Sequence, residues 1–189
     1  MTQAKPKPIE PDSAKWTLER YHDAIASGVI SDWNVELFEG VITPVSPEKP
    51  IHWYRGDQAA RYIEKLVGEQ ALVRFNSPIT LSTTERNPDI AIVKPLGEEY
   101  ASRHPGPDDI LLLVEVAESR PERDLKDKMA IYARAGIQDY WVLDLPSSQL
   151  VVHRSPEDHL YNSVVNFTEG TIKPLLLDVD ILVGRLLGR

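Results

Sequence analysis

A run of five aliphatic residues, 110–114, is followed by Glu115 and then by Val116. An uninterrupted aliphatic run of this length is typical of a strand buried on both faces, as in the middle of a sheet. A carboxylate at that place loses most of its hydration, at a cost on the order of several kcal/mol unless a cation, a metal ion or hydrogen bonds offset it. The pattern therefore indicates that Glu115 faces a compensating group.

The remaining chain alternates between helical stripes and short apolar runs. Helices are predicted over 17–28, with Thr17 as N-cap and Gly28 as terminator, over 47–68, and from Asp124, as N-cap, to residue 135. A hairpin is predicted over 35–42, turning near Glu39-Gly40. Further strands are predicted at 71–75, 78–81, 89–93, 110–116, 140–143, 150–153 and 161–167, with an apolar segment at 172–187.

The order of these elements predicts the topology. The helix between Val116 and Tyr140 makes a strand–helix–strand crossover, which places the two strands parallel in one sheet. The earlier strands are joined by short turns, which favours antiparallel pairing. We expect an α/β domain with a mixed sheet, helices on its faces, and an N-terminal helix and hairpin. Residues 16–189 form one predicted domain, after a flexible N-terminal arm at 1–15.

Composition narrows the function classes. No apolar stretch of the 189 residues approaches the roughly 20 needed to span a bilayer, and the first residues do not resemble a signal peptide, so we expect no membrane association and a cytoplasmic location. Cysteine is absent, which excludes disulfides and thiolate metal sites. The net charge of −8 disfavours a nucleic-acid partner, because affinity for phosphates comes mostly from Lys and Arg, although a local basic face can coexist with an acidic remainder.

Asp89 is the first candidate partner of Glu115. It follows Pro88 and opens the strand 89–93. If this strand neighbours the strand 110–116, Asp89 and Glu115 converge at one end of the sheet, where two carboxylates share either a proton or a divalent cation. Mg²⁺ suits two carboxylates, a backbone carbonyl and retained waters. The alternative is a turn aspartate bonded to backbone amides.

Lys128 and Tyr132 lie one helical turn apart on the third predicted helix, so they share one face. Taken alone, Lys128 fits an ordinary solvated lysine. These residues nevertheless belong to a longer pattern that resembles the Uma-type family of the PD-(D/E)XK, or restriction-endonuclease-like, superfamily. The pattern covers nearly all of 17–155, and its matching positions are Glu36-Leu37-Phe38-Glu39-Gly40, Ser46-Pro47, His52, Pro88-Asp89, Glu115-Val116-Ala117-Glu118-Ser119, Asp124, Lys128, Tyr132, Ala133, Gly136, Tyr140-Trp141 and Asp144.

The resemblance implies a restriction-endonuclease-like core and a metal-dependent nuclease that hydrolyses phosphodiester bonds, with DNA as the expected partner. Asp89 and Glu115 would hold Mg²⁺, or alternatively Mn²⁺, with the backbone carbonyl of Val116 as a third ligand. A lysine would activate the attacking water and stabilise the developing charge. Glu36, on the early hairpin, would add a further carboxylate.

One position departs from the superfamily pattern Glu-x-Lys, because residue 117 is Ala. The Uma-type pattern carries its lysine on the following helix, where Lys128 stands here. Lys126 is nearby but lies about 200° from Lys128 around the helix, so only one of them faces inward, and we expect Lys128. His52 matches a family position, but a lone histidine at a helix start is more often a cap or a packed polar group.

Two alternatives remain open at this stage. The chain is either an active nuclease or a catalytically inactive nuclease-fold module with a binding or regulatory role, with a homodimer as an open assembly in either case. The acidic net charge motivates the inactive reading. Glu115 can also pair with Lys128 or Arg123 as a structural ion pair in a metal-free fold.

Overall fold

β7 (Ile110–Ala117) lies inside a mixed sheet of order β10-β9-β8-β7-β6-β3. The structure is a computed structural model that describes residues 14–30, 34–45, 47–118 and 122–189, without the side chains of 122–124; most of the predicted N-terminal arm lies outside these residues. β7 pairs parallel with β8 and antiparallel with β6, as predicted. The other strands of this sheet are β3 (Leu72–Phe75), β6 (Ile90–Val93), β8 (Asp139–Asp144), β9 (Gln149–Glu157) and β10 (Leu160–Phe167).

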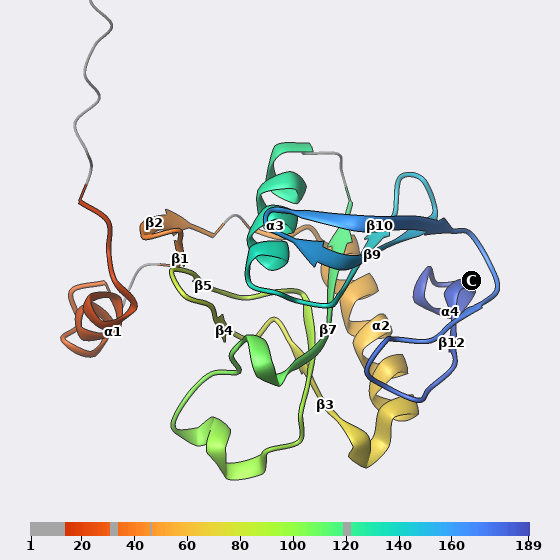
Figure 1. Cartoon of the computed structure of the whole chain (residues 1–189), viewed down its shortest axis with the longest axis horizontal. Coiled ribbons are helices and arrows are strands. Elements are labelled where there is room, and N and C mark those ends of the chain that lie inside the picture. The colour runs from red at the N-terminus through yellow and green to blue at the C-terminus, as the bar shows by residue number, and fades with distance from the viewer. Residues whose placement is uncertain (1–13, 31–33, 46, 119–121) are drawn as a thin grey trace, which may run out of the picture.

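A smaller antiparallel sheet of order β2-β1-β5-β4 stands beside the main sheet (Figure 1). Its strands are β1 (Val35–Phe38), β2 (Val41–Pro44), β4 (Ile79–Thr80) and β5 (Glu85–Arg86). The predicted hairpin turns at Glu39 and Gly40, which have φ values of 48° and 76°, as a two-residue turn with left-handed backbone requires. The sequence pattern does not predict β5, which joins β1 through the single register pair Leu37 and Glu85.

Three helices of the described residues begin and end close to the predicted positions, and a fourth lies in the apolar C-terminal segment, where no helix was predicted. They are α1 (Leu18–Ala26), α2 (Pro50–Val67), α3 (Glu122–Arg134) and α4 (Val183–Leu186). The side chain of Thr17 caps α1 by accepting a hydrogen bond from the Arg20 N–H. The prediction that Asp124 is the N-cap of α3 is wrong, because α3 begins two residues earlier and Asp124 is its third residue. Gly136 follows α3 with a φ of 76°, as a terminating glycine does.

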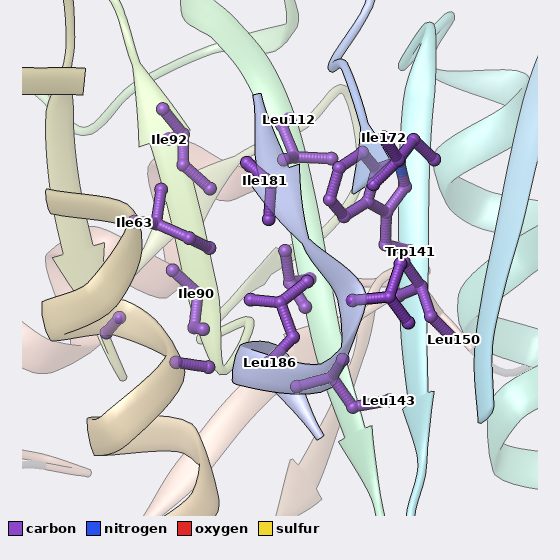
Figure 2. Packing of buried hydrophobic residues seen from close by; sticks show 14 of the residues in the cluster. Ile63, Ile90, Ile92, Leu112, Trp141, Leu143, Leu150, Ile172, Ile181 and Leu186 are labelled. Carbon is purple, nitrogen blue, oxygen red and sulfur yellow. The ribbon is translucent and has the colours of Figure 1, made fainter. Parts of the chain in front are cut away.

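Each face of the main sheet has its own apolar core. α2 and the C-terminal segment, with β11 (Thr171–Ile172), β12 (Ile181–Leu182) and α4, cover one face, and α3 covers the other (Figure 1). Figure 2 shows Ile63 of α2 and Trp141 of β8 on either side of Leu186 of α4, within the apolar cluster of the first face. Because side chains alternate along a strand, Val114 and Val116 pack toward α2, and Glu115 points toward α3.

Short segments complete the described chain. 3₁₀ helices follow α2 at Gly68–Gln70 and interrupt the predicted loop 94–109 at Gly97–Ala101 and Pro107–Asp109. Most of that loop is exposed, as predicted, although Asp109 is buried and pairs with Arg103. Among the helices of the described residues, none combines the length and the apolar character that a bilayer crossing requires.

Candidate active site

Glu115 is almost completely buried, with 1% of its surface exposed, and contacts polar groups of α3. Lys128 Nζ lies 3.0 Å from Glu115 Oε2, and the Tyr132 hydroxyl donates to Oε1 over 2.8 Å. Lys128 is itself only 14% exposed, whereas Lys126 faces solvent. The shared face of Lys128 and Tyr132 therefore meets Glu115. Arg123, the other candidate ion-pair partner, has a side chain outside the described part of the chain.

These contacts decide the charge of Glu115. Burial by itself raises the pKa of Glu115, but the nearby charges of Lys128 and Arg86 and the hydrogen bonds of α3 outweigh it, and the pKa lies below its usual range. Burial and the neighbouring carboxylate raise the pKa of Tyr132 well above its usual value. Tyr132 therefore remains a hydrogen-bond donor, and Glu115 is an ionised carboxylate in a dry setting.

Asp89 directly precedes β6, at the point where β7 continues beyond the edge of β6 and has no strand paired with it on that side. The register pairs Ile90 with Val114, so β7 extends beyond β6. The carboxylate of Asp89 fills the vacant place by accepting the Val116 N–H over 2.6 Å. Asp89 thus accepts a hydrogen bond from a backbone amide, as the alternative interpretation expects. This hydrogen bond also places Asp89 at the same end of the sheet as Glu115. Burial and the charge of Glu115 raise the pKa of Asp89 to about 6.

His52 reaches Asp89 from the first turn of α2. Its Nε2 lies 3.2 Å from Asp89 Oδ2, and its Nδ1 lies 3.3 Å from Glu48 Oε2, which is not aligned for a hydrogen bond. Glu48 and His52 are four residues apart, so both approach Asp89 from the same side. His52 is therefore not the N-cap of α2, which is Lys49, but its mostly buried ring contacts two carboxylates, as a packed polar group does.

The small sheet supplies a third group of polar residues. Glu36 on β1 accepts the Asn87 N–H over 2.8 Å, and Arg86 on β5 lies 3.4 Å from the other oxygen of Glu36. The Arg86 guanidinium also lies 5.4 Å from the centre of the Phe38 ring, within range of a cation–π contact. Arg86 is the cation that sequence reasoning missed, although it stands three positions before Asp89.

A hollow of about 540 Å³ joins these groups. Its carboxylates are Glu36, Glu48, Asp89, Glu115, Glu118 and Asp127. Arg86, Lys128 and His52, whose pKa is raised to about 9, are the cations among the described residues that line it, so acidic groups still predominate. Val116 also lines the hollow. Because the N–H and C=O of one residue in a strand point to the same side, the Val116 carbonyl faces the edge that Asp89 occupies.

The His52–Asp89 contact predicts a dependence of stability on pH. The hydrogen bond to Asp89 raises the pKa of His52 from 6.5 to about 9, although burial opposes the shift. A raised histidine pKa stabilises the fold fully below pH 6.5, and this contribution disappears as the pH rises through 9. Asp89, with a pKa of about 6, is already ionised across this interval.

We therefore expect wild type to be more stable than His52→Gln at pH 6.5. The difference between their free energies of unfolding should decrease by about 2–3 kcal/mol between pH 6.5 and 9.5. Urea unfolding of both proteins in EDTA measures this difference. A difference that stays constant over this interval contradicts a charged His52–Asp89 pair.

The mixed sheet with helices on both faces has the restriction-endonuclease-like architecture. Residues 18–182 match the Uma2 family, whose description is "Putative restriction endonuclease", and the chain belongs to this family. A crystal structure of a protein described as "a putative nuclease belonging to DUF820", from Anabaena variabilis ATCC 29413, matches with a TM-score of 0.67 and 16% identity over 82% of this chain and 89% of that chain. At this identity the likeness concerns the fold alone. No curated protein sequence matches the chain. The predicted family and fold class are confirmed.

Proposed function

We propose that the chain is a Mg²⁺-dependent nuclease that hydrolyses phosphodiester bonds in DNA. The observation that carries the proposal is the approach of Asp89 to Glu115 where β6 begins and β7 ends, with Lys128 bonded to Glu115. Family membership supports a nuclease. Asp89, Glu115 and the carbonyl of Val116 would hold the cation.

The residues present fit a hard dication. All three donors are oxygens, which Mg²⁺ prefers. The negative charge of Glu115 raises the pKa of Asp89, so the two carboxylates repel each other across the hollow. A cation between them would relieve this repulsion. When bound, the cation polarises the phosphodiester and makes a water molecule more acidic.

The side chains of α3 have separate roles in this proposal. Tyr132 holds one oxygen of Glu115 and thereby fixes the orientation of the carboxylate. Lys128, at the rim of the same hollow, offers a positive charge where negative charge develops on the phosphoryl group. Glu36 on the small sheet is held by Asn87 and Arg86, and as a fourth site residue it would orient a water or a cation-bound group.

An inactive binding module is the second candidate function. Both oxygens of Glu115 are engaged by donors of the chain itself, and the hollow is mainly acidic. Acidic walls disfavour phosphate binding unless a cation neutralises them. This reading predicts nucleic-acid or protein binding without turnover, and a cleavage assay separates it from the first.

The test is a cleavage panel on plasmid, linear duplex and single-stranded DNA, with a matching RNA, in Mg²⁺ or EDTA. We expect wild type to cleave DNA only with the cation. Asp89→Asn is expected to reduce the rate by about 100-fold, because it weakens cation binding. Glu118→Gln is the matched control, since it removes a carboxylate of the same hollow that has no assigned role.

Equal cleavage by wild type and Asp89→Asn would point to a co-purified nuclease and would contradict the proposal. Preferential cleavage of RNA would correct the substrate and keep the reaction. If wild type binds nucleic acid but cleaves none of these substrates with Mg²⁺ or Mn²⁺, the inactive module is the better description.

A further inference from the structure

We propose that Glu48, His52 and Asp89 form a second cation position, which takes a first-row transition-metal ion such as Mn²⁺ in preference to Mg²⁺. The proposal rests on the proposed function in one respect, because Asp89 is shared with the Mg²⁺ position. It makes His52 and Glu48 metal ligands, whereas the proposed Mg²⁺ position uses only Asp89, Glu115 and Val116.

The first argument is the compactness of the group. One potential ligand atom from each of the three residues lies within 4.8 Å of the other two, and in the described part of the chain no other set of three His, Asp or Glu residues meets this condition. Glu115 is therefore not a member of this set. Three donors at this separation can approach one ion with small side-chain movements.

The second argument is that the two sets of donors approach Asp89 from different faces of the sheet. Glu115 points toward α3, where Lys128 and Tyr132 bind its oxygens. His52 belongs to α2, on the opposite face. Asp89 stands at the strand end between the two faces and contacts both the Val116 N–H and His52. The α2 side therefore offers Asp89 a set of donors distinct from that of the α3 side.

The third argument is the freedom of the ligands to rearrange. His52 Nδ1 is buried and has no aligned hydrogen bond, so a rotation of the ring would disturb its contacts with Asp89 and Glu48, which both belong to the proposed ligand set. The side chain of Glu48 is 36% exposed and can turn toward an ion. His52 stands on the first turn of α2, which begins at Pro50, and Glu48 directly precedes the N-cap of this helix, Lys49.

Ligand chemistry decides which ion binds. Imidazole nitrogen suits first-row transition-metal ions such as Fe²⁺, Ni²⁺ and Zn²⁺, and the affinity of sites with nitrogen and oxygen ligands rises along the first-row series from Mn²⁺, its weakest member, to Cu²⁺. Mg²⁺ prefers oxygen ligands in a regular octahedron and gives up water reluctantly. An imidazole between two carboxylates therefore favours a transition-metal ion, whereas the all-oxygen position at Glu115 favours Mg²⁺.

The test measures cation binding without nucleic acid. Calorimetric titration of the cation-free protein is expected to give Mn²⁺ an affinity about tenfold or more above that of Mg²⁺. Pulsed electron paramagnetic resonance of bound Mn²⁺ is expected to show modulation from a coordinated imidazole ¹⁴N. His52→Gln should abolish this modulation and reduce Mn²⁺ affinity by about tenfold or more, with Mg²⁺ affinity within about threefold of wild type. Glu48→Gln should weaken Mn²⁺ binding in the same direction.

Asp127→Asn is the matched control, since it removes an acidic group of the same hollow outside the triad and should change neither affinity. Thermal unfolding in EDTA shows whether each variant is folded. Absence of ¹⁴N modulation in wild type, or equal Mn²⁺ affinity in wild type and His52→Gln, overturns the proposal and leaves an ordinary His52–Asp89 ion pair.

Glu115→Gln distinguishes this proposal from the proposed function. It should retain the ¹⁴N modulation while Mg²⁺ binding and cleavage are lost. If Glu115→Gln changes neither Mg²⁺ binding nor cleavage, the proposed nuclease site fails even when the results for His52 hold.

Discussion

Replacing Glu115 with alanine is expected to lower the free energy of unfolding by about 3–5 kcal/mol in the absence of divalent cations. The carboxylate is 1% exposed and is bonded to Lys128, which is 14% exposed, and to the fully buried Tyr132. Alanine would leave an ammonium group and a hydroxyl without these acceptors in a dry environment. The lowered pKa of Glu115 agrees with this expectation, because a lowered pKa means that the folded protein stabilises the ionised carboxylate. Urea unfolding in EDTA at neutral pH measures the loss.

Glu115→Gln is the matched control for this effect. Its amide oxygen can accept from Tyr132 or Lys128, so we expect a smaller loss of about 1–2 kcal/mol. The double variant Glu115→Ala, Lys128→Met should recover part of the loss, because it removes the stranded charge together with its partner. If Glu115→Ala unfolds within about 0.5 kcal/mol of wild type, the ion pair with Lys128 contributes nothing measurable.

Mg²⁺ separates a purely structural ion pair from a cation site. Saturating cation should stabilise wild type in proportion to the logarithm of its concentration over Kd, and it should leave Glu115→Ala unchanged. Wild type that is insensitive to Mg²⁺ and Mn²⁺ favours the metal-free ion pair instead. A structure determined after a Mn²⁺ soak gives the same decision, since a true cation site acquires electron density.

The central sheet was predictable because its signal is local and strong. The aliphatic run 110–114 gives β7, and the helix closed by Gly136 forces the parallel crossover to β8. β5 left no such signal, because two residues carry no periodicity and its pairing with Leu37 joins distant parts of the chain. The start of α3 was displaced because Asp124 is a good N-cap in isolation, while the helix in fact begins at Glu122.

The approach of Asp89 to Glu115 was predictable from the sequence, whereas the contact of His52 with Asp89 was not. Asp89 and Glu115 meet because antiparallel neighbours bring the start of one strand to the end of the other. The contact of His52 depends instead on how closely α2 approaches the sheet. Gly56 allows that approach, since a Cβ there would lie 2.7 Å from the ring of Phe75. A glycine inside a helix, at a cost of about 0.8–1 kcal/mol against alanine, was the available sign of this close packing.

Lys128→Met is expected to reduce the cleavage rate by about 10²–10³-fold. Lys128 Nζ is 3.0 Å from Glu115 Oε2 and borders the hollow where a phosphodiester would lie, so its charge can stabilise the developing negative charge. The same substitution should tighten Mg²⁺ binding several-fold, because a cation no longer competes for Glu115. Single-turnover cleavage and calorimetry measure the two effects on one protein.

Lys126→Met is the matched control, since it removes an exposed lysine of the same helix that points about 200° away, and it should change neither quantity. Slower cleavage together with tighter Mg²⁺ binding in Lys128→Met would identify Lys128 as a catalytic charge. If Lys128 only holds Glu115 in place, its loss should weaken Mg²⁺ binding and cleavage together. Unchanged cleavage would contradict a role of Lys128 in the reaction. With Ala at position 117, the active site would then need another cation, for which Arg86, which also lines the hollow, is a candidate.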